Sequence, residues 1–235
     1  MVVAADPGGL DADESRRLRE LATVFLAEKS LEPVQGMVLT RHMERVIAVQ
    51  ACLPVLNLGF DWLDALVSVV VYPETFLAEV TERDEAGIVH NYREARSGES
   101  WDRGPMLLSW ADVEEDAGLD GYNVILHEVA HKLDALDGTA NGMPPMRSRR
   151  AAGQWSRVFN AAYAEFNRRV EAGEEMPIDP YAGESPAEFF AVFSEGFFEI
   201  PHVVHGAWPA IYAELAGFYR QDPLARFARP ARVTV

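Results

Sequence analysis

His127, Glu128 and His131 occur in the order H-E-x-x-H, within the segment NVILHEVAHKLDALDG that runs from residue 123 to residue 138. Apolar residues at helical spacing around them predict a largely buried helix. Residues four apart lie on one face of a helix, so the two imidazoles can bind the same metal ion. Glu128 lies about 100° around the helix from His127, where its carboxylate can contact a water on that ion. This pattern is typical of zinc hydrolases.

A third ligand is needed, because a catalytic zinc ion usually has three protein ligands and one open position. The extended pattern H-E-x-x-H-x-x-G-x-x-H is excluded, since Asp134 and Asp137 stand where its glycine and third histidine would be. The later segment SPAEFFAVFSEGFFE offers Glu188 and Glu195 on one face of a predicted helix. A carboxylate from this second helix is therefore the expected third donor.

The residues alone leave the roles of these acidic side chains open. Glu188 fits two roles equally, as a zinc ligand or as the partner of Ser185 in a capping box at the start of the helix. Glu195 is less favoured as a ligand, but it can accept the second N–H of a ligating histidine. Asp134 shares the face of the two histidines, where it can orient a ligand or bind an arginine.

A second histidine pair, His202 and His205, is spaced three residues apart in PHVVHGAW. The segment PHVVHGAW itself contains no acidic or cysteine residue to complete a metal site. We expect both to be surface or helix-end residues.

The composition indicates a globular protein with a strongly acidic balance. Its 235 residues include 21 Lys and Arg against 37 Asp and Glu, a formal net charge of −16. This charge argues against binding to nucleic acids or anionic membranes, which require a basic surface. The single cysteine, Cys52, excludes a disulfide scaffold and fits a reducing compartment. The sequence shows neither a signal peptide nor a membrane-spanning run, so we expect a cytoplasmic protein.

The pattern along the chain predicts helices that flank a few central strands. Helical spacing predicts helices over residues 14–29, 40–53, 60–66, 149–171, 186–198 and 209–219. β-branched and alternating residues predict strands over 68–76, 87–96 and 105–110, of which the second can pair with the first. We expect a flexible tail at 1–12 and a single α+β domain at 13–235, mostly helical with a small central sheet and with a helical N-terminal part up to about residue 66.

The segments HEVAHKLD and YAGESPAEFFAVFSEGFF occur in this order along the chain. Together they resemble the bacterial family of Mlc titration factor A, whose members are zinc-dependent peptidases. The same region is similar to the catalytic domain of anthrax lethal factor. In the titration factor family and in lethal factor, a tyrosine stands seven residues before the glutamate that completes the zinc site. Tyr181 stands at the same distance before Glu188. VVVYPETF and GESWDRGPMLLSW also resemble the titration factor family, so the resemblance runs from about the first predicted helix to the last.

This resemblance implies a zincin-like metallopeptidase fold with Zn²⁺ bound by His127, His131 and Glu188. It implies that Glu128 is the general base and that Tyr181 directs its hydroxyl at the metal-bound water or the substrate. It also implies aminopeptidase-like hydrolysis of a peptide or protein substrate, and a partner in a transcriptional repressor of sugar uptake, Mlc. The alternative is a protein that sequesters a repressor, with a structural zinc site and little peptidase activity.

Overall fold

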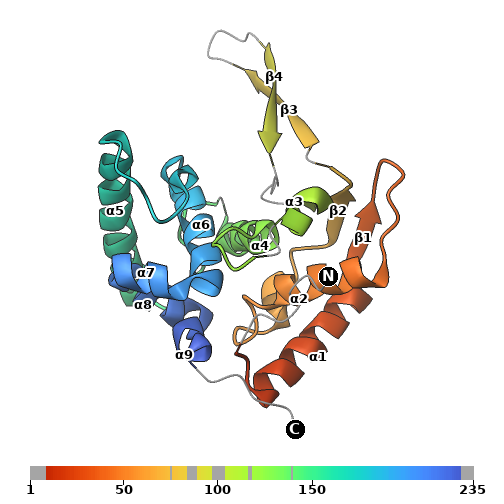
Figure 1. The fold of residues 1–235 in the computed structure, drawn as a ribbon, viewed down its shortest axis with the longest axis horizontal. Coiled ribbons are helices and arrows are strands. Elements are labelled where there is room, and N and C mark those ends of the chain that lie inside the picture. The colour runs from red at the N-terminus through yellow and green to blue at the C-terminus, as the bar shows by residue number, and fades with distance from the viewer. Residues whose placement is uncertain are drawn as a thin grey trace.

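A computed structural model of the protein describes residues 9–74, 76–83, 89–96, 104–115, 118–138 and 140–228, with the strands at 76–83 and 89–96 described by their backbone alone. Helices make up most of it (Figure 1), as predicted for a mostly helical α+β protein. They are α1 (Ala12–Glu28), α2 (Arg41–Cys52), α3 (Trp110–Glu115), α4 (Val124–Asp134), α5 (Arg149–Glu171), α6 (Pro186–Glu199), α7 (Pro201–Ala207), α8 (Pro209–Tyr219) and α9 (Pro223–Phe227), with short 3-10 helices η1 (Phe60–Leu63), η2 (Ala135–Asp137) and η3 (Pro180–Gly183).

A small parallel sheet lies beside these helices, with strand order β1-β2-β5. Its strands are β1 (Ser30–Pro33), β2 (Ser68–Tyr72) and β5 (Met106–Ser109). In the central strand, Val69 and Val71 are fully buried, and the three alternating residues, Ser68, Val70 and Tyr72, are partly exposed. The β-branched run at 68–72 therefore forms the buried strand that was predicted.

The predicted pairing of the 87–96 segment with this central strand is wrong. β4 (Val89–Arg96) pairs antiparallel with β3 (Phe76–Arg83), a strand that the sequence pattern did not separate from β2. Pro73 ends β2, and the chain starts a new strand only three residues later, which gives β4 a nearer partner. Figure 1 shows this hairpin extending away from the helices.

α4, which carries the H-E-x-x-H motif, occupies the centre of the molecule (Figure 1). It packs against α6 on one side and against α2 and β5 on the other. Ile125, Val129 and Leu133 are fully buried in these contacts. The helix begins at an N-cap, Asn123, whose side chain accepts the backbone N–H of Leu126. The motif therefore lies on a rigid, internally buried element.

An aromatic cluster fixes α6 against α5 and α8. Trp155 stacks on Phe159 with ring centroids 3.9 Å apart, and both rings contact Phe190 of α6. Phe189 packs edge-on against Phe166 at 5.7 Å. Each fully buried aromatic ring contributes about 1.5–3 kcal/mol through the area it removes from water. The helix predicted over residues 149–171 is thus confirmed as α5, and its buried face fixes the helix that carries Glu188.

Several short elements were not predicted, among them β1, η3, α7 and α9, because four to seven residues carry too little periodicity to be recognised. η1 also ends at Leu63 instead of the predicted residue 66. His202 and His205 lie on α7 and are both exposed, as expected for surface residues. Within the described ranges, no helix combines the length and the apolar character that crossing a bilayer would require.

Candidate metal centre

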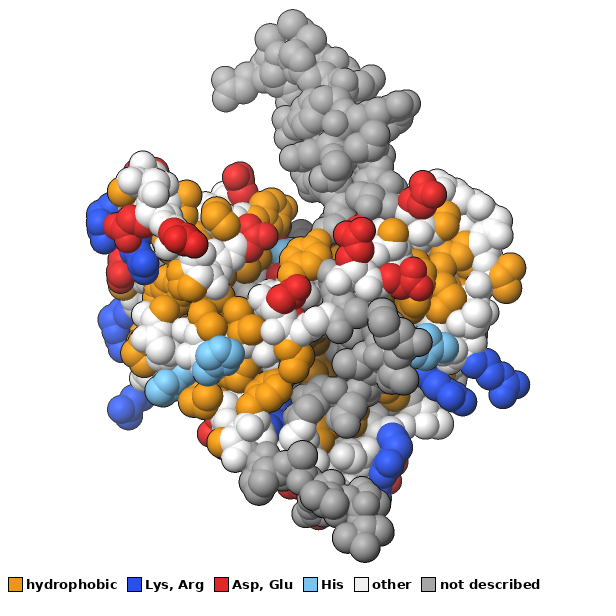
Figure 2. Space-filling model, viewed as in Figure 1, with side chains coloured by type: hydrophobic (Ala, Val, Ile, Leu, Met, Phe, Trp, Pro, Cys, Tyr) orange, Lys and Arg blue, Asp and Glu red, His pale blue; other side chains and the backbone are white. Residues whose placement is uncertain are grey.

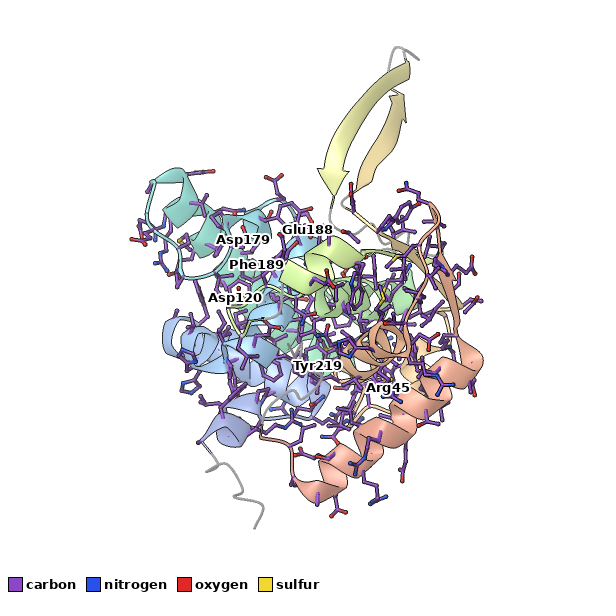
Figure 3. The ribbon with its side chains drawn as sticks, turned by 45° about the vertical axis from the view of Figure 1, so that its right-hand side comes forward. Arg45, Asp120, Asp179, Glu188, Phe189 and Tyr219 are labelled. Carbon is purple, nitrogen blue, oxygen red and sulfur yellow. The ribbon has the colours of Figure 1, made fainter. Side chains whose placement is uncertain are left out.

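Side chains from α4 and α6 converge on one point. Nε2 of His127 lies 3.1 Å from Nε2 of His131. Oε2 of Glu188 lies 3.0 Å from the first of these nitrogens and 3.3 Å from the second. The three side chains are largely buried, with exposed fractions of 14%, 12% and 19%. The structure therefore brings together the three predicted ligands, and Figure 3 shows Glu188 where α6 meets α4.

The spacing of these donor atoms fits a tetrahedral metal site. Ligand distances of about 2.0–2.1 Å at tetrahedral angles place neighbouring donors about 3.3–3.4 Å apart, close to the separations found here. Two unprotonated imidazole nitrogens in contact repel each other unless a cation lies between them. Next to them, Oε2 of Glu128 is buried and has no hydrogen-bond partner among the described residues. The donor set and this unpartnered oxygen both fit a metal ion and its water.

Glu188 has only part of the capping role that the sequence left open. The Ser185 hydroxyl accepts the backbone N–H of Glu188 at 3.1 Å, so the N-cap is present. The Glu188 carboxylate, however, contacts His127 and His131 instead of returning to the Ser185 amide. Burial opposes ionisation of Glu188, but the hydrogen bonds from the two histidines outweigh it and lower its pKa below the ordinary value. The charged carboxylate is thus available at the cluster.

Glu195 contacts the other nitrogen of His127. Its Oε1 lies 2.7 Å from Nδ1, and its Oε2 accepts the backbone N–H of Asn123 at 2.6 Å. This is the orienting contact that the sequence allowed for Glu195. Burial disfavours the charged imidazole, but Glu195 and Glu188 outweigh this and raise the pKa of His127. A proton on Nδ1 leaves the lone pair of Nε2 directed at the cluster.

Asn123 and Glu199 are site residues that the sequence analysis missed. Nδ2 of Asn123 donates to Oε1 of Glu199 at 2.9 Å, and the Gly121 N–H donates to Oε2 at 3.2 Å. Burial raises the pKa of Glu199 to about 8, against the effect of these two hydrogen bonds. A signal was present in the sequence, because Glu199 lies eleven residues after Glu188 and so on the same side of α6.

Asp134 has neither of the roles considered for it. It is fully buried, and its Oδ2 accepts the N–H of Gly142 at 2.6 Å, which ties the loop after α4 to the helix. That loop passes close to α6, since a Cβ on Gly142 would lie 2.3 Å from the Pro186 carbonyl oxygen. Burial raises the pKa of Asp134 from 3.8 to about 6.

We expect Asp134→Asn to make the stability of the metal-free protein less dependent on pH. Because the folded state favours the protonated carboxyl, the stability from this group is fully present below about pH 3.8 and is lost as the pH rises to about 6. Between about pH 5 and about pH 7, the wild type should lose about 1 kcal/mol of unfolding free energy relative to the variant. Urea unfolding at both pH values measures this difference, and an equal pH dependence in the two proteins would contradict it.

Tyr181 lies on η3, beside the cluster. Its ring centroid is 6.3 Å from that of His127, and 47% of its surface is exposed. The Asp179 carboxylate accepts the Tyr181 N–H at 2.9 Å, and the Tyr163 hydroxyl donates to the Gly183 carbonyl at the end of η3. Two hydrogen bonds therefore hold the segment that presents this tyrosine next to the cluster.

Comparison with known proteins shows the family of this chain. Residues 7–220 match the family model described as glucose-regulated metallo-peptidase M90. Mlc titration factor A of Yersinia pestis (strain Pestoides F) is 39% identical over 223 residues, which cover 94% of this chain and 82% of the relative. The protein of the same name from Yersinia pseudotuberculosis serotype O:1b (strain IP 31758) has the same identity and coverage. The chain therefore belongs to the glucose-regulated metallo-peptidase M90 family, the family of Mlc titration factor A.

Proposed function

We propose that the protein is a zinc metallopeptidase that hydrolyses peptide bonds with an activated water. The observation that supports this proposal best is the buried, unpartnered carboxylate oxygen of Glu128 next to the cluster of His127, His131 and Glu188. Such an oxygen is costly unless it has a proton to accept. We further propose that residues 13–235 form one zincin-like domain, located in the cytoplasm.

In the proposed site, His127, His131 and Glu188 hold the ion, and neutral imidazole with carboxylate suits zinc. When bound, zinc lowers the pKa of a water to about 7 and polarises the scissile carbonyl. Glu128 accepts the proton of the attacking water and passes it to the leaving amine. Burial raises the pKa of Glu128, which makes its carboxylate a stronger base, while both histidines oppose this shift. Tyr181 donates its hydroxyl proton in a hydrogen bond to the developing oxyanion.

The substrate class that we propose is short peptides cleaved in an aminopeptidase-like manner. A panel of aminoacyl and short peptidyl p-nitroanilides, assayed with added zinc, tests both the activity and this preference. Release of p-nitroaniline from aminoacyl substrates supports the proposal. Cleavage of blocked, N-acylated peptides alone would replace the aminopeptidase preference with an endopeptidase one.

Tyr181→Phe should lower kcat by about 100- to 1,000-fold, the effect of removing one oxyanion donor, with little change in zinc affinity. The ring is retained in this variant, so its contact with His127 persists and only the hydroxyl is lost. Stopped-flow or steady-state kinetics on the best p-nitroanilide, with zinc content measured on the same sample, provide the comparison. An unchanged kcat would mean that Tyr181 is only a surface residue beside the site.

A second candidate function is the binding of a transcriptional repressor, supported by the name Mlc titration factor A that the relatives carry. The net charge of −16 is compatible with a basic, DNA-binding partner, and Figure 2 shows acidic side chains spread over the upper half of the face in view. Pull-down of a purified Mlc repressor by the wild type and by Glu128→Gln tests it. If both proteins capture the repressor equally, binding is independent of peptide hydrolysis; if neither does, this candidate is wrong for this chain.

A further inference from the structure

Three carboxylates of α6 face the beginning of α4. Glu188, Glu195 and Glu199 lie on one side of α6, because positions seven and eleven residues apart return to nearly the same angle on a helix. The first two contact the ring of His127, and the third contacts Asn123. One side of α6 thus contacts both His127, a candidate metal ligand, and Asn123, the residue at which α4 starts.

Asn123 is the centre of these contacts, and all of its polar groups are used. Its backbone N–H donates to Glu195 at 2.6 Å, and its carbonyl accepts the backbone N–H of His127 at 2.9 Å. Its Oδ1 accepts the N–H of Leu126 at 3.0 Å, and its Nδ2 donates to Glu199 at 2.9 Å. The residue is 4% exposed. Its position is therefore determined from four directions.

Glu199 lies in an environment that disfavours a charged carboxylate. It is 7% exposed, and it is the last residue of α6, where the helix dipole disfavours a negative charge. Its two carboxylate oxygens accept hydrogen bonds, one from the side-chain amide of Asn123 and the other from the backbone N–H of Gly121. Both donors belong to the segment that enters α4, so Glu199 holds this entry in place.

We propose that Asn123 and Glu199 are positioning residues for His127. Glu199 holds the amide of Asn123, the backbone of Asn123 holds the carboxylate of Glu195, and Glu195 accepts the Nδ1 proton of His127. This chain of contacts fixes both the tautomer and the direction of the ring, so that Nε2 points at Glu188 and His131. The inference rests on the proposed metal site and extends it by two residues that do not touch the ion.

A capping role alone does not account for this arrangement. Serine, aspartate and asparagine cap helices about equally well through one side-chain oxygen. Among these residues, only asparagine adds an N–H donor that can reach Glu199, whereas an aspartate at 123 would place a second carboxylate against it. Asn123→Ser therefore keeps the cap and removes only the link to Glu199, which separates the two roles.

The test measures zinc affinity by competition with a chromophoric chelator, for the wild type, Asn123→Ser, Glu199→Ala and the double variant. Each single variant should bind zinc about 10-fold more weakly, the low end of the range for an outer partner of a ligand. The double variant should be no weaker than either single variant, since both changes break the same link. Glu165→Ala, which removes an exposed carboxylate of α5, is the matched control and should bind like the wild type.

A second readout follows the His127 ring directly. In the zinc-loaded wild type, the Nδ1 proton held by Glu195 should be visible by NMR and exchange slowly with water, and exchange should be faster in both variants. If Asn123 and Glu199 had a structural role alone, the variants would have a lower melting temperature, but the exchange rate of this proton and the zinc affinity would not change. If Asn123→Ser does not fold, Glu199→Ala and Glu199→Leu, neither of which can accept a hydrogen bond from Asn123, provide the same two measurements.

Zinc affinities within about twofold of the wild type in both single variants would overturn the positioning role. A loss that is confined to one variant, or that adds up in the double variant, would also contradict a shared link. An absence of zinc binding by the wild type itself would instead overturn the proposed function. The two failures are thus distinguishable in the same titration.

Discussion

Glu128→Gln should lower kcat/KM on peptide substrates by about 100- to 10,000-fold, the usual contribution of a general base. The substitution retains the size and polarity of the side chain but removes its ability to accept a proton. The three proposed ligands are untouched, so zinc should remain bound. The loss should appear mainly in kcat, because proton transfer takes place in the transition state and not in substrate binding.

The control for this result is Glu165→Gln, which makes the same chemical change at an exposed position of α5 and should leave kcat/KM unchanged. Zinc content has to be measured on every sample, because loss of the ion would mimic loss of the base. Equal rates for Glu128→Gln and wild type, both with full zinc, would rule out Glu128 as the base. The binding of a repressor would then become the leading function.

Glu188→Ala should weaken zinc binding by more than about 100-fold, since even outer partners of a ligand change metal affinity by about 10- to 100-fold. Peptidase activity should fall with the bound zinc and recover in part at high zinc concentration. A chelator competition gives the affinity, and activity as a function of added zinc gives the recovery.

Ser185→Ala is the matched control for this variant, because it removes the N-cap hydrogen bond at the start of α6 and leaves the Glu188 carboxylate in place. Among the described residues, the Ser185 hydroxyl accepts the backbone N–H of Glu188 and no other hydrogen bond, so its loss should cost about 1 kcal/mol of stability and leave zinc affinity unchanged. If Glu188→Ala behaves like Ser185→Ala, with lower stability and normal zinc binding, Glu188 is a capping residue and not a ligand.

Most of the secondary structure followed from the sequence by itself. The 3.6-residue spacing of Trp155, Phe159 and Phe166 is a local property, and α5 has the predicted limits at Arg149 and Glu171. Proline and capping residues also act locally, which explains why the starts of α2 and α6 agree with the prediction. Strand pairing is not local, and there the prediction for the 87–96 segment was wrong.

The sequence also determined which residue types are available for chemistry, because the H-E-x-x-H spacing places two imidazoles on one face of any helix that contains it. It could not determine what each carboxylate contacts, since Glu188, Glu195 and Asp134 all have the helical phase that such a role requires. Only the tertiary structure decided this. The packing of α6 against α4 brought Glu188 and Glu195 to His127 and Glu199 to Asn123 across 76 positions of sequence, whereas Asp134 contacts Gly142 in the loop that follows α4. Contacts between residues so far apart depend on how whole helices dock, and helix periodicity holds no information about that docking.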